Sequence, residues 1–348
     1  MKKYIFLSLI LFVSNNLFGQ KTVREKISDY LEDKVKTNDF SGAVLVAKHN
    51  KILFSKAYGL ANKELNVKNT LQTKFKIGSI TKQFTAAAIL KLVEEKKIKL
   101  EDKLSAFYPN YPKGDQITIH MLMNHSSGIK NYTSLPLFAT LSTLPLSKDS
   151  LISVFKNESL DFVPGSNWKY SNSGYFLLGC IVEKVSKQSF NDFIIQYLIN
   201  PSQLKNTLLD KSETILPNRA NGYSRAGDKW QNADYISMEL PFSAGAMIST
   251  VGDLFLWNKT LYAEKILSKP ILQKMTSQYL GKYGYGLFVD TLFHQQRFGH
   301  TGGIPGFISQ NDYYPKEKLH VIVLANFNAK SDEIAKDLAN ILIQSNLK

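Results

Sequence analysis

The chain has 348 residues, of which 44% are hydrophobic and 21% are charged, and this balance excludes a disordered or fibrous protein. Its length allows one large hydrophobic core or two smaller ones. The formal net charge of +14 could favour polyanions. However, only four of the 43 basic residues are arginine, the residue that most often reads base edges, and no nucleic-acid-binding motif accompanies them. We therefore interpret the charge as a solvated, lysine-rich surface and expect no nucleic-acid partner.

The N-terminal segment has the pattern of a secretory signal peptide. Two lysines precede an apolar run from Tyr4 to Val13, and a small residue, Gly19, stands just before Gln20. The run is shorter than the roughly 20 apolar residues that a transmembrane helix needs. We expect residues 1–19 to be a signal peptide, and the mature protein to be periplasmic or extracellular with no transmembrane segment after cleavage. An uncleaved membrane anchor is the alternative.

Strand-like segments occur at both ends of the mature chain, with helical segments between them. Near the N-terminus, SGAVLVAKH and KILFSKAYG flank a short polar break, which predicts a β-hairpin. A helix is predicted from about Ser79, and helical patterns continue between about residues 100 and 280. After Lys282, short runs broken by Gly, Asp and Pro predict an antiparallel meander, followed by an amphipathic helix from Ser331. We therefore predict an α+β fold with one antiparallel sheet formed by both termini, and residues 20–348 as a single bilobal domain.

Ser79 and Lys82 stand three positions apart at the start of the predicted helix, so both side chains lie on one face. A serine hydroxyl becomes a good nucleophile when a base takes its proton, and lysine can be that base if burial lowers its pKa. Backbone N–H groups at the helix start also favour developing negative charge. The pattern Ser-x-x-Lys occurs six times and is weak alone, but at Ser79 a glycine precedes the serine and a clean apolar helix follows.

Tyr170 and Asn172 form a Tyr-x-Asn pattern just after the turn VPGSN. A tyrosine hydroxyl that faces the lysine can relay a proton to a leaving group, and an asparagine amide can hold both the lysine and a substrate carbonyl. The same pattern recurs at residues 108–110 in a proline-bearing loop, so a packed turn tyrosine is the alternative for Tyr170.

The segment RFGHTGGIPGF occurs once and places His300, Thr301 and Gly302 on a predicted strand edge. Such an edge offers backbone hydrogen bonds to an extended substrate, and its glycines permit close approach. The backbone N–H groups of Gly303 and Ser79 would form an oxyanion hole. The six histidines of the chain show no metal-site spacing such as His-Glu-x-x-His, so we expect neither a metal nor another cofactor.

In this order the three motifs resemble those of the penicillin-binding protein and class C β-lactamase superfamily of serine hydrolases. Phrases such as MLMNHSSGI and FSAGAMISTVGDLFLWNK are similar to the same family. The resemblance implies a β-lactamase/transpeptidase-like fold whose active site lies between the sheet and a mostly helical lobe. It implies Ser79 as the acylated nucleophile, Lys82 and Tyr170 as proton-transfer partners, Asn172 as a contact of lysine and substrate, and residues 300–302 as the substrate-aligning strand.

The implied activity is hydrolysis of a small amide or ester, with a D-alanine-type cell-wall peptide as the expected substrate, as in D-alanyl-D-alanine carboxypeptidases. His300 stands where many β-lactamases carry lysine, and a near-neutral histidine is less suited to a substrate carboxylate. A histidine here is similar to the soluble D-alanyl-D-alanine carboxypeptidases and to broad esterase and peptidase relatives, which weakens the β-lactamase interpretation. A β-lactamase or a broad esterase is one alternative, and a penicillin- or peptide-binding sensor without turnover is another. Class C relatives place a glutamine after the HSSGI phrase, where this chain has Asn131 and Tyr132 without an assignable match.

Overall fold

A six-stranded antiparallel sheet lies at the centre of the computed structural model, which describes residues 21–227 and 229–345. Its strand order is β10-β11-β12-β13-β1-β2, so the first strands of the chain pair directly with the last. The predicted N-terminal hairpin and C-terminal meander are both confirmed. The strands are β1 (Gly42–Lys48), β2 (Lys51–Tyr58), β10 (Phe288–Leu292), β11 (Gln295–Ile304), β12 (Phe307–Tyr314) and β13 (Leu319–Ala325).

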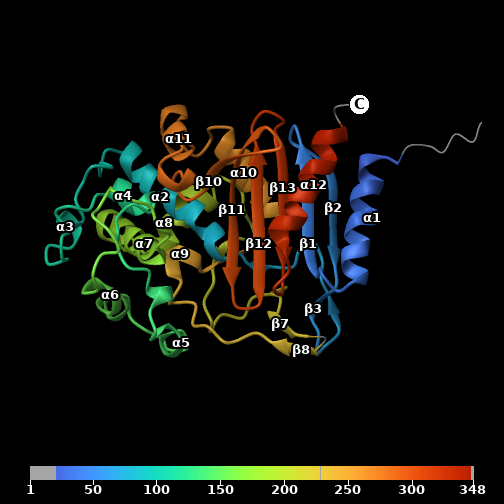
Figure 1. Cartoon of the computed structure of the whole chain (residues 1–348), viewed down its shortest axis with the longest axis horizontal. Coiled ribbons are helices and arrows are strands. Elements are labelled where there is room, and N and C mark those ends of the chain that lie inside the picture. Colours follow the sequence, from blue (N-terminus) through green and yellow to red (C-terminus); the bar gives the residue numbers. More distant parts are fainter. Residues whose placement is uncertain (1–20, 228, 346–348) are drawn as a thin grey trace, which may run out of the picture.

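Helices cover both faces of this sheet (Figure 1). Alternate residues of β1 point to opposite sides: Leu45 packs in the core beneath the helical lobe, whereas Val44 packs against α1 (Val23–Lys36) and α12 (Ser331–Ser345). Because both faces are buried, the strand is apolar along almost its whole length. The predicted C-terminal amphipathic helix is thus confirmed as α12, which packs on β12 and β13.

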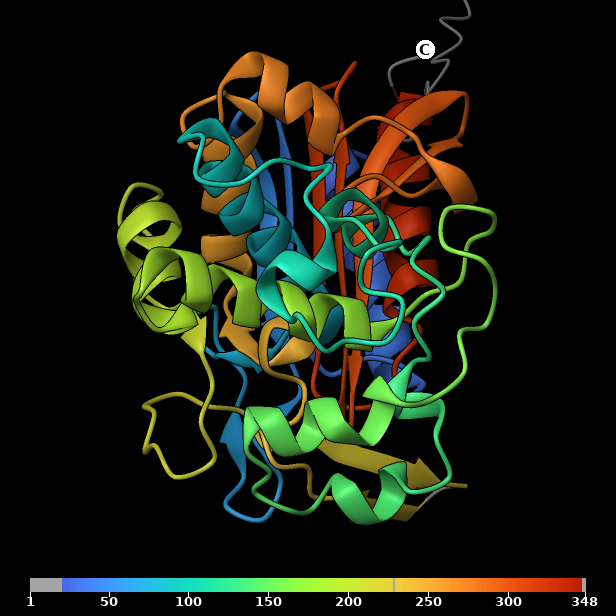
Figure 2. The same ribbon diagram turned by 90° about the vertical axis from the view of Figure 1, so that its left-hand side faces the viewer.

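The other face carries the larger, mostly helical lobe, which stands in front of the sheet in Figure 2. At its centre lies α2 (Thr81–Glu94), whose residues are buried continuously from Thr81 to Leu90 and which packs on α7 (Asn172–Ser186) and α9 (Phe242–Gly245). The remaining α-helices are α3 (Leu104–Phe107), α4 (Ile119–Met123), α5 (Phe138–Leu141), α6 (Lys148–Lys156), α8 (Phe190–Ile194), α10 (Val251–Tyr262) and α11 (Lys269–Met275). Three short 3-10 turns, η1 (Gly78–Ile80), η2 (Tyr132–Ser134) and η4 (Leu280–Lys282), and one π-helical turn, η3 (Ile195–Ile199), complete the set.

Three small sheets complete the fold. The first pairs β3 (Leu60–Asn62) with β4 (Val67–Lys68), and the third pairs β7 (Tyr223–Ala226) with β8 (Lys229–Asn232). In the second, β9 (Met247–Ser249) lies between β5 (Phe75–Lys76) and β6 (Leu208–Leu209). Within the described ranges, no helix is both long and apolar enough to cross a membrane. The predicted signal peptide, residues 1–19, lies outside the described residues.

Candidate active site

Ser79 lies in the 3-10 turn η1, directly before α2 and against strand β11. Gly78 precedes it with a φ of +49°, a conformation that glycine adopts without strain. A Cβ on Gly78 would meet the backbone N of Gly303 at 2.8 Å, and a Cβ on Gly302 would meet the carbonyl oxygen of Ile77 at 1.9 Å. The two glycines therefore let β11 approach the turn that carries Ser79 closely.

Lys82 is completely buried in the first turn of α2, and its Nζ has three polar neighbours. Nζ lies 3.1 Å from the Oγ of Ser79, 2.7 Å from the Oδ1 of Asn172 and 2.7 Å from the carbonyl oxygen of Ala244. Burial lowers the pKa of Lys82 well below its ordinary value. A neutral amine donates two N–H groups, which Asn172 and Ala244 accept, so its lone pair is left for the Ser79 hydroxyl proton.

Asn172 is held in this orientation by residues after the HSSGI phrase. Its Nδ2 donates to the Oγ1 of Thr133 at 3.2 Å, so its Oδ1 faces Lys82. Its backbone N–H donates to the Oδ1 of Asn131 at 3.1 Å. Sequence reasoning did not assign Asn131, Thr133 or the Ala244 carbonyl, because each acts through a contact with a residue far away in the chain.

Tyr170 lies beside Lys82, with Nζ 4.8 Å from the centre of its ring. Its hydroxyl is buried and has no hydrogen-bond partner among the described residues. Burial raises the pKa of Tyr170, while the nearby Ser79 hydroxyl opposes that shift. The phenol is thus protonated at neutral pH and free to donate to a group that arrives at Ser79.

His125 holds the backbone on both sides of Tyr170. Its carbonyl oxygen accepts from the N–H of Lys169 at 3.0 Å, and its Nδ1 accepts from the N–H of Ser171 at 3.2 Å. Its ring packs on the ring of Tyr170 with centroids 4.4 Å apart. Burial, followed by the positive charges that Lys82 and His300 can carry, lowers the pKa of His125 well below its ordinary value, so the ring is neutral and Nδ1 stays an acceptor.

His300 is buried, and its side chain does not offer a charge to the site. Its Nδ1 lies 2.7 Å from the carbonyl oxygen of Thr301 and its Nε2 lies 2.9 Å from the hydroxyl of Tyr283. The carbonyl can only accept, so Nδ1 carries the proton and Nε2 accepts from Tyr283. Burial and then the nearby Lys82 lower the pKa of His300 to about 3. What this segment can present to a substrate is therefore its backbone.

The substrate-facing edge of β11 is open beyond Gly299, because β10 ends its pairing there with Phe288. On the other side, β11 and β12 close into a hairpin with Ile304 opposite Phe307. In a two-residue hairpin the closing pair exchanges hydrogen bonds, and hydrogen-bonded and non-hydrogen-bonded pairs then alternate along the strands. Gly303 belongs to the next, non-hydrogen-bonded pair, so its N–H points away from β12 toward the open edge. It therefore joins the N–H of Ser79 as a candidate oxyanion donor.

A pocket of about 240 Å³ opens in front of these groups. It includes Ser79, Asn172 and Gly303, and we call it the Ser79 pocket. Its other lining residues are Tyr132, Thr133, Phe138, Ile236, Leu240, Pro241, Ala244, Gly245, Ile304 and Pro305.

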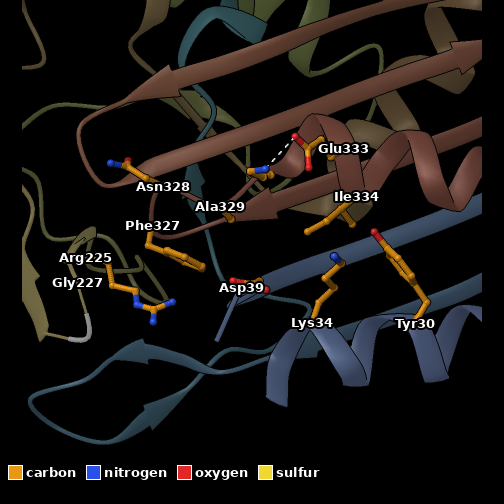
Figure 3. Close-up of a pocket in the computed structure, with 11 residues that line it drawn as sticks. Tyr30, Lys34, Asp39, Arg225, Gly227, Phe327, Asn328, Ala329, Glu333 and Ile334 are labelled. Carbon is orange, nitrogen blue, oxygen red and sulfur yellow. Dashed lines mark ion pairs between the residues drawn. The ribbon is translucent and has the colours of Figure 1, made fainter. Parts of the chain in front are cut away.

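A different pocket, of about 390 Å³, lies on the opposite side of the sheet between α1 and α12 (Figure 3). Lys34 and Asp39 line it, and Lys330 pairs there with Glu333 at 3.2 Å. No serine, threonine or cysteine is among its described lining residues, so it has no aliphatic hydroxyl or thiol nucleophile for acyl transfer. Across the described ranges, no three His, Cys, Asp or Glu side chains gather in a way that could bind a metal ion.

Comparisons with known proteins agree with this geometry. A family model described as Beta-lactamase matches residues 27–345. Penicillin-binding protein 4* of Bacillus subtilis (strain 168) is 27% identical over 328 residues, which cover 87% of this chain and 72% of that protein. The crystal structure of a penicillin binding protein from Bacillus halodurans has a TM-score of 0.81 and 25% identity, covering 90% of this chain and 98% of that one. A D-stereospecific amidohydrolase from Streptomyces sp. has a TM-score of 0.78 and 27% identity, covering 90% and 97%.

Proposed function

The chain belongs to the Beta-lactamase family of serine hydrolases, and we propose that it hydrolyses a small amide or ester through an acyl-enzyme on Ser79. One observation carries this proposal: the buried Nζ of Lys82 lies between Ser79, Asn172 and the carbonyl of Ala244. That arrangement uses both N–H groups of a neutral amine and directs its lone pair at the nucleophile. A protein that only binds its ligand would not need such a base, whereas a sensor that is acylated would use it to activate Ser79, so product formation is what distinguishes an enzyme from an acylated sensor.

In the first half of the reaction, the Oγ of Ser79 attacks the substrate carbonyl carbon while its proton passes to the Nζ of Lys82. The N–H groups of Ser79 and Gly303 stabilise the negative charge on the carbonyl oxygen. When the intermediate collapses, the leaving group takes the hydroxyl proton of Tyr170, and Tyr170 regains a proton from Lys82. The acyl group is then bound to Ser79 as an ester, and Lys82 is neutral again.

In the second half, water attacks the ester carbonyl and gives a proton to Lys82. The tetrahedral intermediate expels the Oγ of Ser79, which takes this proton back. The acid is released and the site returns to its initial state. Both halves use the same oxyanion donors.

For the substrate class, we infer a D-amino-acid amide or ester or a D-alanine-type cell-wall peptide. The amidohydrolase at 27% identity is described as D-stereospecific, and the Bacillus subtilis relative at 27% identity is named as a penicillin-binding protein. His300 is neutral and faces Tyr283, so this part of β11 has no charged side chain for a free substrate carboxylate. We therefore place amide and ester hydrolysis ahead of the carboxypeptidase reaction. An exported protein, as the N-terminal pattern predicts, would meet such substrates outside the cytoplasm.

The test compares the mature protein with Ser79→Ala on a penicillin, a D-Ala-D-Ala peptide, a D-phenylalanine amide and a phenyl ester, following intact mass and product together. We expect an acyl adduct or product with the wild type only. A persistent penicillin adduct with amide or ester turnover supports the proposal, and rapid penicillin turnover would instead indicate a β-lactamase. Wild-type activity in Ser79→Ala would show that the nucleophile is wrongly assigned.

A further inference from the structure

The Ser79 pocket has a defined position relative to the two halves of a substrate. Asn172 lines it, whereas Tyr170 does not. In the proposed mechanism the leaving group departs next to Tyr170, which supplies its proton. The pocket therefore lies on the other side of the scissile bond, where the acyl part of the substrate is bound.

The described residues that line this pocket carry no charge. Leu240 and Ile236 are buried in its wall, and Phe138 and Ile304 are partly buried there. These side chains give it an apolar surface next to the nucleophile.

Polar side chains of the wall already have hydrogen-bond partners within it. The hydroxyl of Tyr132 donates to the carbonyl oxygen of Leu240 at 3.0 Å, and the Oγ1 of Thr133 accepts from the Nδ2 of Asn172 at 3.2 Å. A carboxylate or ammonium group entering the pocket would lose water without gaining an ion-pair partner, which is costly. An apolar acyl chain has no such hydration to lose, and burial of its surface in the pocket stabilises the complex.

We propose, on the basis of the function proposed above, that the Ser79 pocket, of about 240 Å³, binds the side chain of the acyl group and selects side chains that are uncharged and apolar. The selection acts on the acyl half, so it is independent of whether the leaving group is an amine or an alcohol. Within the proposed substrate class, it favours amides and esters whose acyl side chain is apolar, wherever the rest of the acyl group lies.

The test uses p-nitrophenyl esters that share one leaving group and differ only in the acyl part. The acetyl ester is too short to fill the pocket and reports acylation of Ser79 alone. The hexanoyl ester is compared with the adipoyl monoester and the ε-aminohexanoyl ester, which have similar length and end in a carboxylate or an ammonium. We expect kcat/KM for the hexanoyl ester to exceed that for each charged ester by about tenfold or more.

A charged variant of the pocket wall distinguishes selectivity from the intrinsic reactivity of the esters. Phe138 is partly buried on the short helix α5, and Phe138→Lys would place an ammonium at the pocket wall. We expect the ratio of kcat/KM for the adipoyl and hexanoyl esters to rise about tenfold. Leu65→Lys is the matched control, because Leu65 is 75% exposed beside the β3–β4 pair and does not line the pocket.

The outcomes separate the two proposals. Turnover of the acetyl ester by the wild type but not by Ser79→Ala, with equal rates for the hexanoyl and charged esters, overturns the pocket assignment and leaves the serine hydrolase standing. The same follows if Phe138→Lys and Leu65→Lys shift the ratio equally. If no ester is turned over and no adduct forms, both proposals fail together.

Discussion

The Nδ1 of His125 accepts a hydrogen bond of 3.2 Å from the backbone N–H of Ser171, the residue between Tyr170 and Asn172. The carbonyl of the same histidine accepts from Lys169 at 3.0 Å. One residue thus fixes the peptide groups on both sides of the candidate proton donor. His125 touches neither Ser79 nor a substrate in the proposed mechanism, so we regard it as a positioning residue for Tyr170.

We predict that His125→Phe lowers kcat about 10- to 100-fold with a smaller change in KM, because Tyr170 loses its alignment with the leaving group. The phenyl ring keeps the aromatic packing but cannot accept from Ser171. His125→Asn should retain more activity, since its Oδ1 can accept and asparagine tolerates the φ of 64° found here. The measurement is steady-state kinetics beside thermal melting of both variants. If the two variants lose activity only in proportion to lost stability, His125 has a purely structural role.

The activity of the wild type should depend on a neutral Lys82. We predict that kcat/KM falls as the pH drops through the lowered pKa of Lys82, because the ammonium cannot take the Ser79 proton. Lys82→Met should abolish turnover, whereas Lys91→Met, at a partly exposed position in the last turns of the same helix, should not. The check is a pH–rate profile with an uncharged ester. A profile that stays flat down to pH 5 would rule out Lys82 as the base.

Lys82 should also make folding stability depend on pH. The unfolded chain keeps a proton on this lysine up to about pH 10.5, while the folded chain releases it at lower pH. Its contribution is therefore fully present above pH 10.5 and declines by about 1.4 kcal/mol per pH unit as the pH falls toward the folded-state pKa. Urea unfolding between pH 7 and pH 10 should show this slope in the wild type and a flatter one in Lys82→Met. Identical slopes in the two proteins would mean that Lys82 is charged in the folded state.

Tyr170→Phe should separate activity from stability. The buried hydroxyl has no partner among the described residues, and an unsatisfied buried group of this kind costs about 1–3 kcal/mol. We predict that its removal leaves the melting temperature unchanged or higher while kcat for an amide falls about 100-fold or more. An activated ester, whose leaving group needs no proton, should be affected less. A destabilised variant, or equal losses on amide and ester, would contradict the assigned role of Tyr170.

The sequence predicted those parts of the molecule that depend on neighbouring residues. The hairpin of residues 42–58 and the apolar run of β13 follow from local composition, and the spacing of Ser79 and Lys82 is local as well. The sheet formed by both termini could be predicted because the long strand-like segments occur at the two ends of the chain. The short strands between them, such as β7 and β8, were not predicted. The helix was predicted from Ser79, and the structure shows that the regular helix begins at Thr81 after a 3-10 turn, since Gly78 and β11 fix the turn.

Contacts across long stretches of chain were not predictable in the same way. The carbonyl of Ala244 meets Lys82 across 162 positions, and nothing in a backbone carbonyl marks it in the sequence. The neutral state of His300 was expected from its ordinary pKa, but its cause is burial and contact with Tyr283, which only the fold brings beside it. The segment MLMNHSSGI, which contains His125, resembles the family, but nothing in the sequence indicates that His125 holds Tyr170.

The last prediction concerns the close approach of β11 to the nucleophile. A Cβ at Gly302 would stand 1.9 Å from the carbonyl oxygen of Ile77, so either β11 or the turn before Ser79 must move. We predict that Gly302→Ala costs about 2–3 kcal/mol of stability and most of the activity, because the N–H of Gly303 shifts with the strand. Gly303→Ala is the matched comparison: its Cβ would meet only the Ile308 side chain at 3.5 Å, so its stability should stay within about 0.5 kcal/mol. Thermal melting and ester turnover of both variants measure this, and equal melting temperatures would show that β11 does not constrain the site.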